Sequence, residues 1–94
     1  MALQDRFGQA LQLARKSRDL TQEDFSDVSS RTYLSTLERG LKSPTLEKIQ
    51  QLSAVLGMHP VSLLALAYML DKKGNLESLF DKIRNDVSST MESR

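Results

Sequence analysis

The chain has 94 residues, of which 39% are hydrophobic and 27% charged, a composition typical of one globular domain with a modest core. It has no cysteine, which excludes disulfides, thiolate metal sites and cysteine nucleophiles. Its formal net charge is +1, so any basic surface for an acidic partner must be local.

Apolar residues at helical spacing between Leu3 and Ala14 predict a first helix, and Leu13 widens its apolar stripe. The charges of Asp5 and Arg6 interrupt the apolar stretch that a secretory signal needs. We therefore expect the protein to remain in the cytoplasm.

A short second helix is predicted at residues 22–28. Thr21 precedes it, with Asp24 three residues later, and this arrangement resembles a capping box. Residues 27–30 have no helical stripe and two hydroxyl side chains, so they predict a turn.

A third helix is predicted at residues 31–39. The hydroxyl of Ser30 can cap its start, and Gly40 ends it where a left-handed backbone is needed. Leu34 and Leu37 lie three residues apart and would face the core. The opposite face is then polar and carries Arg31, Thr32, Ser35 and Thr36.

Two apolar helices follow. Thr45 caps a fourth helix that Gly57 ends, and its predicted inner face consists of Leu46, Ile49, Leu52, Val55 and Leu56. Pro60 opens a fifth helix, which is almost entirely apolar up to Leu70 and is expected to continue to about Lys73. We expect this helix at the centre of the core, because its apolar run is about half the length that spans a bilayer.

A polar break at residues 71–75 precedes a last helix, from about Leu76 to Met91. Its apolar stripe has spacing close to that of a coiled coil and consists of Leu76, Phe80, Ile83, Val87 and Met91. These side chains can pack back on their own domain or form a twofold interface. We favour the interface because the stripe is long.

Two short helices joined by a tight turn are typical of a helix-turn-helix, whose second helix enters the major groove of DNA. Residues 31–39 suit that role, because arginine can bond guanine twice and a threonine methyl can pack against thymine. No histidine pair, glycine-rich phosphate loop or Ser-His pair at motif spacing is present in the sequence. We therefore expect no enzyme, no metal and no cofactor.

From Leu13 to Leu64 the sequence resembles the lambda-repressor and Cro type of helix-turn-helix domain, the XRE-like regulators of bacteria and phages. The matching residues are Arg15, the run Leu20–Phe25, the run Ser30–Gly40, the segment Ser43–Glu47 and the pair Leu56–Gly57. The resemblance implies an all-α, lambda-repressor-like five-helix DNA-binding domain at residues 1–70. Residues 71–94 would add a C-terminal amphipathic helix.

The resemblance also implies roles for individual residues. Gln22 would bond a phosphate and often touch a neighbouring side chain on the recognition helix. The base-reading residues would be Arg31, Thr32, Ser35 and Thr36. The DNA backbone would be held by Arg39, Lys42 and Ser43. Separately from the resemblance, the Tyr33 ring can pack beside the core or its hydroxyl can reach a phosphate. Arg15 and Glu38 would form an ion pair that ties the first helix to the end of the third.

The turn before the third helix departs from the family pattern. It is about two residues shorter and lacks the usual glycine. We therefore expect Ser29 or Ser30 to cap the recognition helix, at an angle to the preceding helix that can differ from that in the family.

We predict a sequence-specific, DNA-binding transcriptional regulator. In this interpretation it is a repressor that binds a palindromic operator in double-stranded DNA as a homodimer, and the dimerisation residues are Leu76, Phe80, Ile83 and Val87. The alternative is an antitoxin-type module that docks a small toxin on its last helix and binds DNA secondarily. A controller of a restriction-modification system would share the fold and differ in genomic setting.

Overall fold

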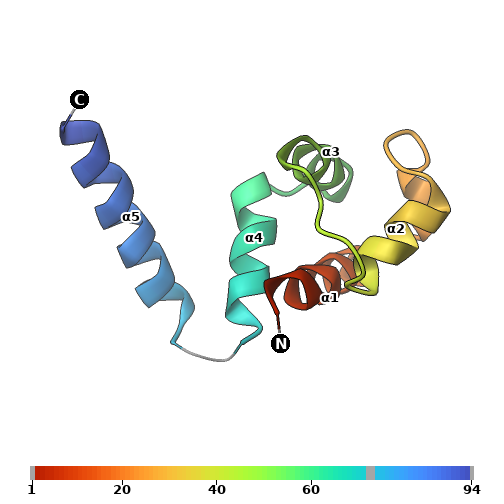
Figure 1. The fold of residues 1–94 in the computed structure, drawn as a ribbon, viewed down its shortest axis with the longest axis horizontal. Coiled ribbons are helices and arrows are strands. Elements are labelled where there is room, and N and C mark those ends of the chain that lie inside the picture. Colours follow the sequence, from red (N-terminus) through yellow and green to blue (C-terminus); the bar gives the residue numbers. More distant parts are fainter. Residues whose placement is uncertain (1, 72–73, 94) are drawn as a thin grey trace.

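The computed structural model describes residues 2–71 and 74–93. Its elements are α1 (Leu3–Ser17), the 3₁₀ helix η1 (Gln22–Phe25), α2 (Arg31–Glu38), α3 (Leu46–Leu56), α4 (Pro60–Met69) and α5 (Leu76–Glu92). The elements from α1 to α4 form one body, and α5 lies beyond α4 on the side away from α2 (Figure 1). The predicted all-α, lambda-repressor-like arrangement with an added C-terminal helix is confirmed over this part of the chain.

Most helix boundaries are set by residues that act within one turn of the helix end, either as capping side chains or as left-handed glycines. The Thr45 hydroxyl accepts the Lys48 N–H at 3.0 Å and begins α3, and Gly57, with φ of 69°, ends it. His59 begins α4, where its Nδ1 accepts the Val61 N–H at 3.0 Å. The helix ends at Met69, and its predicted extension to Lys73 reaches residues outside the described part of the chain.

The core lies where α1, α2, α3 and α4 meet, with α1 and α4 packed along each other. It consists of Phe7, Ala10, Leu11, Ala14, Phe25, Leu34, Leu37, Ile49, Leu52, Leu56, Leu63 and Ala67. Removing these apolar side chains from water is the main term that holds the helices together. Because the set includes Phe25, Leu34 and Leu37, the same core supports the predicted helix-turn-helix.

The helix α2 approaches α1 closely at a glycine. A Cβ atom on Gly8 would lie 2.5 Å from the Leu37 carbonyl oxygen and 2.7 Å from that of Glu38. At the other end of α1, Arg18 Nε donates to the Leu56 carbonyl at 2.7 Å. These contacts hold α2 and α3 against α1.

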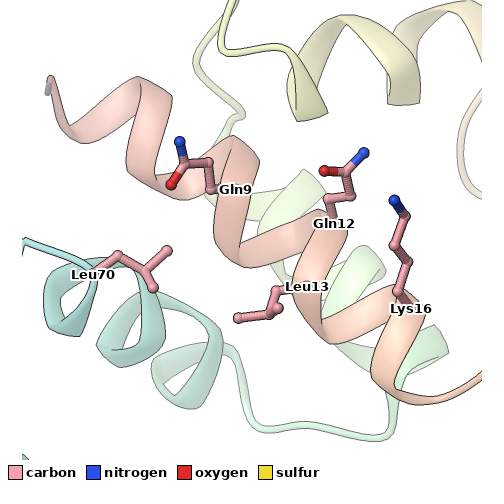
Figure 2. Close-up of a pocket in the computed structure, with 5 residues that line it drawn as sticks. All are labelled: Gln9, Gln12, Leu13, Lys16 and Leu70. Atoms are coloured by element: carbon pink, nitrogen blue, oxygen red, sulfur yellow. The ribbon is translucent and has the colours of Figure 1, made fainter.

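Two leucines predicted to face the core are exposed instead. Leu46, the first residue of α3, is 83% exposed, because it lies with Gln50 and Ala54 along an open hollow on the outside of the helix. Leu13 is 52% exposed. Figure 2 shows Leu13 and Leu70 extending from α1 and α4 toward the gap between these helices, where they line an open hollow of about 420 Å³.

The helix α4 is central on one face and exposed on another. Leu63 and Ala67 are fully buried, whereas Val61 is 44% and Tyr68 48% exposed, so the expectation of a wholly central helix is wrong for that second face. Within the described ranges, no single helix is long and apolar enough to cross a membrane. The helices α3 and α4 reach such a composition together but are bent by 96°.

The last helix does not pack into the core. None of the residues of α5, all of which the structure describes, is buried. Leu79 and Ile83 are half-buried where they face α4, while Phe80 is 38% and Val87 56% exposed. Packing of the apolar stripe against its own domain is therefore incomplete.

Candidate nucleic-acid interface

The first part of the helix-turn-helix is shorter than the sequence predicts. The carboxylate of Asp24 accepts bonds from the Thr21 N–H at 2.7 Å and the Thr21 hydroxyl at 3.1 Å. The helix that begins there is 3₁₀ and ends at Phe25, rather than running over residues 22–28. The buried Phe25 anchors it, and its carbonyl accepts N–H groups from Val28 and Ser29, which closes the tight turn early.

Ser30, one of the two caps expected, caps the start of the recognition helix α2. Its side chain accepts the Tyr33 N–H at 3.1 Å. At the other end Gly40 has φ of 72° and donates its N–H to the Leu37 carbonyl, so the helix stops after Glu38. The result is a helix of eight residues with both ends fixed.

The four predicted base-reading residues share the outer face of α2. Leu34 and Leu37 are fully buried beneath it. Arg31 and Thr32 are exposed, and Ser35 and Thr36 are half-buried. Within the described residues, the side chains of Arg31, Thr32 and Ser35 make no hydrogen bond. These groups are therefore available to a ligand that approaches α2 from outside.

A buried ion pair lies beneath this helix. Arg15 Nε lies 2.7 Å from Glu38 Oε2, and Arg15 Nη2 lies 3.0 Å from Glu38 Oε1, so the pair is bidentate. The two side chains are 10% and 2% exposed. The hydrogen bond to Glu38 raises the pKa of the Arg15 guanidinium, which is therefore charged at any ordinary pH. The pair joins α1 to the last residue of α2, as the sequence suggested.

Gln22 is held by the same carboxylate. Its Nε2 donates to Glu38 Oε1 at 3.2 Å. An amide nitrogen has two protons, so one remains for another acceptor. Glu38 thus orients Gln22 at the start of η1, where the sequence predicts a phosphate contact.

The loop after α2 is tied back to α1 by a residue that sequence reasoning missed. Gln4 Nε2 donates to the Gly40 carbonyl at 2.6 Å, and Gln4 Oε1 accepts the Ser43 hydroxyl at 2.7 Å. Arg39 and Lys42 are exposed on the same loop. The Ser43 hydroxyl is already used, so a phosphate contact there would fall to its backbone N–H or to Arg39 and Lys42. No local signal in the sequence marks Gln4.

A helix-turn-helix family model matches residues 11–63, more than half of the chain, and these residues include every part of the arrangement except Gln4. The chain belongs to the XRE-type helix-turn-helix family of DNA-binding transcriptional regulators.

Two solved structures resemble this helix-turn-helix protein. The clp gene regulator ClgR from C. glutamicum is 28% identical, with a TM-score of 0.68, and the match covers 72% of this chain and 91% of that one. The restriction-modification controller protein C.AhdI from Aeromonas hydrophila is 31% identical, with a TM-score of 0.60 and coverage of 63% and 92%. No curated protein sequence matches the chain.

In this family member the short turn is fastened by Lys48, which sequence reasoning also missed. Lys48 Nζ donates a short hydrogen bond to the Val28 carbonyl and lies 5.7 Å from the centroid of the Tyr33 ring. Tyr33 is half-buried and packs against the core, so its ring supports α2 from below. One side chain of α3 therefore fixes the turn and the start of the recognition helix together.

Residues 2–71 and 74–93 contain no group of three or more His, Cys, Asp or Glu side chains arranged to hold a metal ion. The chemistry that this surface offers is hydrogen bonding and charge. It comes from the outer face of α2, from Gln22 before it and from the loop after it.

Proposed function

We propose that the protein is a repressor that binds a palindromic operator as a homodimer in the cytoplasm. The observation that carries the proposal is the outer face of α2, where Arg31, Thr32 and Ser35 lie above a buried leucine pair and have no partner among residues 2–71 and 74–93. A recognition helix enters the major groove with such a face toward the base edges. A protein bound over a promoter in this way would block polymerase without a further partner, and we therefore propose repression.

Local charge supports DNA binding although the net charge is only +1. Arg31, Arg39 and Lys42 are exposed on α2 and its following loop. Glu38 lies between them in sequence, but Arg15 already neutralises it at 2.7 Å. The exposed charges of α2 and of the loop after it are therefore all positive, which suits contact with phosphates.

A homodimer follows from the size of the recognition surface. One eight-residue helix offers too few base contacts to discriminate strongly against random DNA. Two such helices related by twofold symmetry read half-sites about 34 Å apart, and the operator then shares their symmetry.

We propose that α5 of a second copy occupies the groove between α4 and α5. The groove has a volume of about 370 Å³ and is lined by Val61, Leu64, Ala65, Tyr68, Leu79, Lys82, Ile83 and Asp86. Its walls are apolar, and its rim charges Lys82 and Asp86 pair with each other at 2.7 Å. An occupant therefore needs an apolar face, which an amphipathic helix with apolar residues every three or four positions provides.

The α5 helix meets that requirement itself. Its exposed stripe consists of Leu76, Phe80, Val87 and Met91. Leu79 and Ile83 continue this stripe into the groove. In the proposed dimer, α5 of each copy therefore forms one wall of its own groove and inserts its exposed stripe into the groove of the other copy. A contact of this kind is self-complementary and closes as a twofold dimer.

The test of the function is selection of bound sequences from random duplex DNA. We expect a twofold-symmetric consensus whose half-sites are centred about one helical turn apart. Absence of any enriched sequence would contradict sequence-specific binding and favour the antitoxin-type alternative, in which α5 docks a toxin. An enriched but asymmetric site would contradict the dimer alone.

Replacing Val87 with Asp should turn the dimer into a monomer. Val87 is 56% exposed in one chain, and an aspartate buried there without a partner would weaken self-association by at least about 100-fold. The control is Asn85→Asp, which adds the same charge on the opposite side of α5. Sedimentation equilibrium at micromolar concentration should give a monomer for the first variant and a dimer for the second. Equal masses for both variants would contradict the proposed interface.

A further inference from the structure

The hydroxyl of Thr36 is already committed as a donor. Thr36 Oγ1 donates to the Thr32 carbonyl oxygen, one helical turn earlier, at 2.8 Å. Threonine commonly makes this bond in helices, because one of its χ1 rotamers points the hydroxyl back along the helix. A hydroxyl carries one proton, so this bond leaves only its lone pairs for another molecule.

The neighbouring residues on the outer face differ in this respect. Arg31 is a donor in any orientation, because a guanidinium has no lone pair to offer. The hydroxyls of Thr32 and Ser35 have no partner among the described residues, so they can rotate to donate or to accept. Among the described residues of this face, Thr36 therefore differs from Thr32 and Ser35. Its own hydrogen bond fixes its hydroxyl, which can act toward DNA only as an acceptor.

We propose that Thr36 is a specificity-determining residue that selects an amino base, adenine or cytosine, on the strand it contacts. In the major groove adenine N6 and cytosine N4 are donors, whereas guanine O6 and thymine O4 are acceptors. If the Thr36 oxygen faced a keto oxygen, neither acceptor would receive a hydrogen bond from the other. An amino group in the same place donates a hydrogen bond to the Thr36 oxygen. This inference rests on the proposed function, because it needs α2 in the major groove.

The same bond also fixes the threonine methyl. With Oγ1 held on Thr32, χ1 has one value, and the methyl group takes one position beside the oxygen. The residue therefore presents an acceptor and an apolar group in fixed order. Thr36→Val removes the acceptor and keeps the branched shape, and Thr36→Ser keeps the hydroxyl and removes the methyl.

The test is selection from random duplex DNA with the full-length wild type and both variants. We expect the wild-type consensus to contain one position per half-site where adenine or cytosine is preferred over guanine or thymine by about fivefold. Thr36→Val should abolish that preference and leave the other positions unchanged, and Thr36→Ser should retain it. A keto preference at the position that Thr36→Val changes would overturn the inference, as would an amino preference that survives in Thr36→Val.

A base analogue gives a second readout on the selected site. Where the preferred base is adenine, purine lacks only the 6-amino group, and where it is cytosine, 2-pyrimidinone lacks only the 4-amino group. The analogue should weaken wild-type binding about fivefold and leave Thr36→Val binding unchanged. Equal loss in both proteins would overturn the role of Thr36 while leaving the proposed function intact. Absence of any enriched site in the selection would overturn the proposed function, and this inference with it.

Discussion

Replacing Arg31 with Ala is expected to lower affinity for the selected operator by about 10- to 100-fold. Arg31 is the first residue of α2, the end of a recognition helix that reaches the base edges, and its side chain is exposed. A guanidinium that grips guanine O6 and N7 with two bonds contributes about 1–3 kcal/mol of discrimination. Affinity for random duplex DNA, which depends on phosphate contacts, should fall much less.

The measurement is fluorescence anisotropy on labelled operator and random duplexes at one fixed salt concentration. Lys42→Ala is the matched control, because Lys42 is exposed on the loop after α2 and is predicted to contact phosphate. It should weaken binding to both duplexes alike and reduce the dependence of log affinity on log salt by about one. If Arg31→Ala also weakened both duplexes equally, Arg31 would be a phosphate ligand and not a base reader.

The helix boundaries near the site were predictable because they depend on nearest neighbours in sequence. Ser30 and Thr45 accept N–H groups three residues ahead, and Gly40 and Gly57 supply left-handed backbone. Each of these residues acts within its own turn, so residue type alone indicates the structure. The polar outer face of α2 follows from the three-residue spacing of its leucines.

The form of the turn was not predictable in the same way. Residues 22–28 carry helix signals, yet the helix there is 3₁₀ and ends at Phe25. The carbonyl of Val28 bonds the side chain of Lys48, twenty residues later, and that contact depends on how α3 is placed. The exposure of Leu46 has a similar origin, because burial depends on which neighbour a helix face meets.

For the candidate site, the sequence places residues on a surface but does not show how their hydrogen bonds are used. Periodicity alone puts Thr36 on the outer face, whereas its bond to Thr32 depends on a rotamer. Gln22 and Ser43 are predicted phosphate ligands, yet each is bonded to a residue at least sixteen positions away. Such contacts form only when η1 packs against α2 and the loop after α2 packs against α1.

The ion pair under the recognition helix should have the largest effect on stability. Glu38→Ala is expected to lower the free energy of unfolding by about 3–5 kcal/mol, because it leaves the buried Arg15 charge without its carboxylate, and the Leu20 carbonyl, 3.0 Å from Arg15 Nη1, is a neutral acceptor. The Arg15 side chain is only 10% exposed, and its Nε, 2.7 Å from Glu38, would lose its acceptor. A small domain has a total stability of about 5–15 kcal/mol, so this variant should lose a substantial part of it. Urea denaturation followed by circular dichroism measures the change.

A double variant separates stability from DNA binding. Arg15→Met with Glu38→Leu replaces both charges by apolar groups of similar size, and such replacements of buried pairs are often neutral or stabilising. The double variant should therefore recover most of the stability that Glu38→Ala loses. It should still bind operator more weakly than the wild type, because Gln22 loses the carboxylate that orients it at 3.2 Å. A double variant with both wild-type stability and wild-type affinity would show that Glu38 does not position Gln22, and a loss below about 1 kcal/mol in Glu38→Ala would show that Arg15 is not held in a desolvated site.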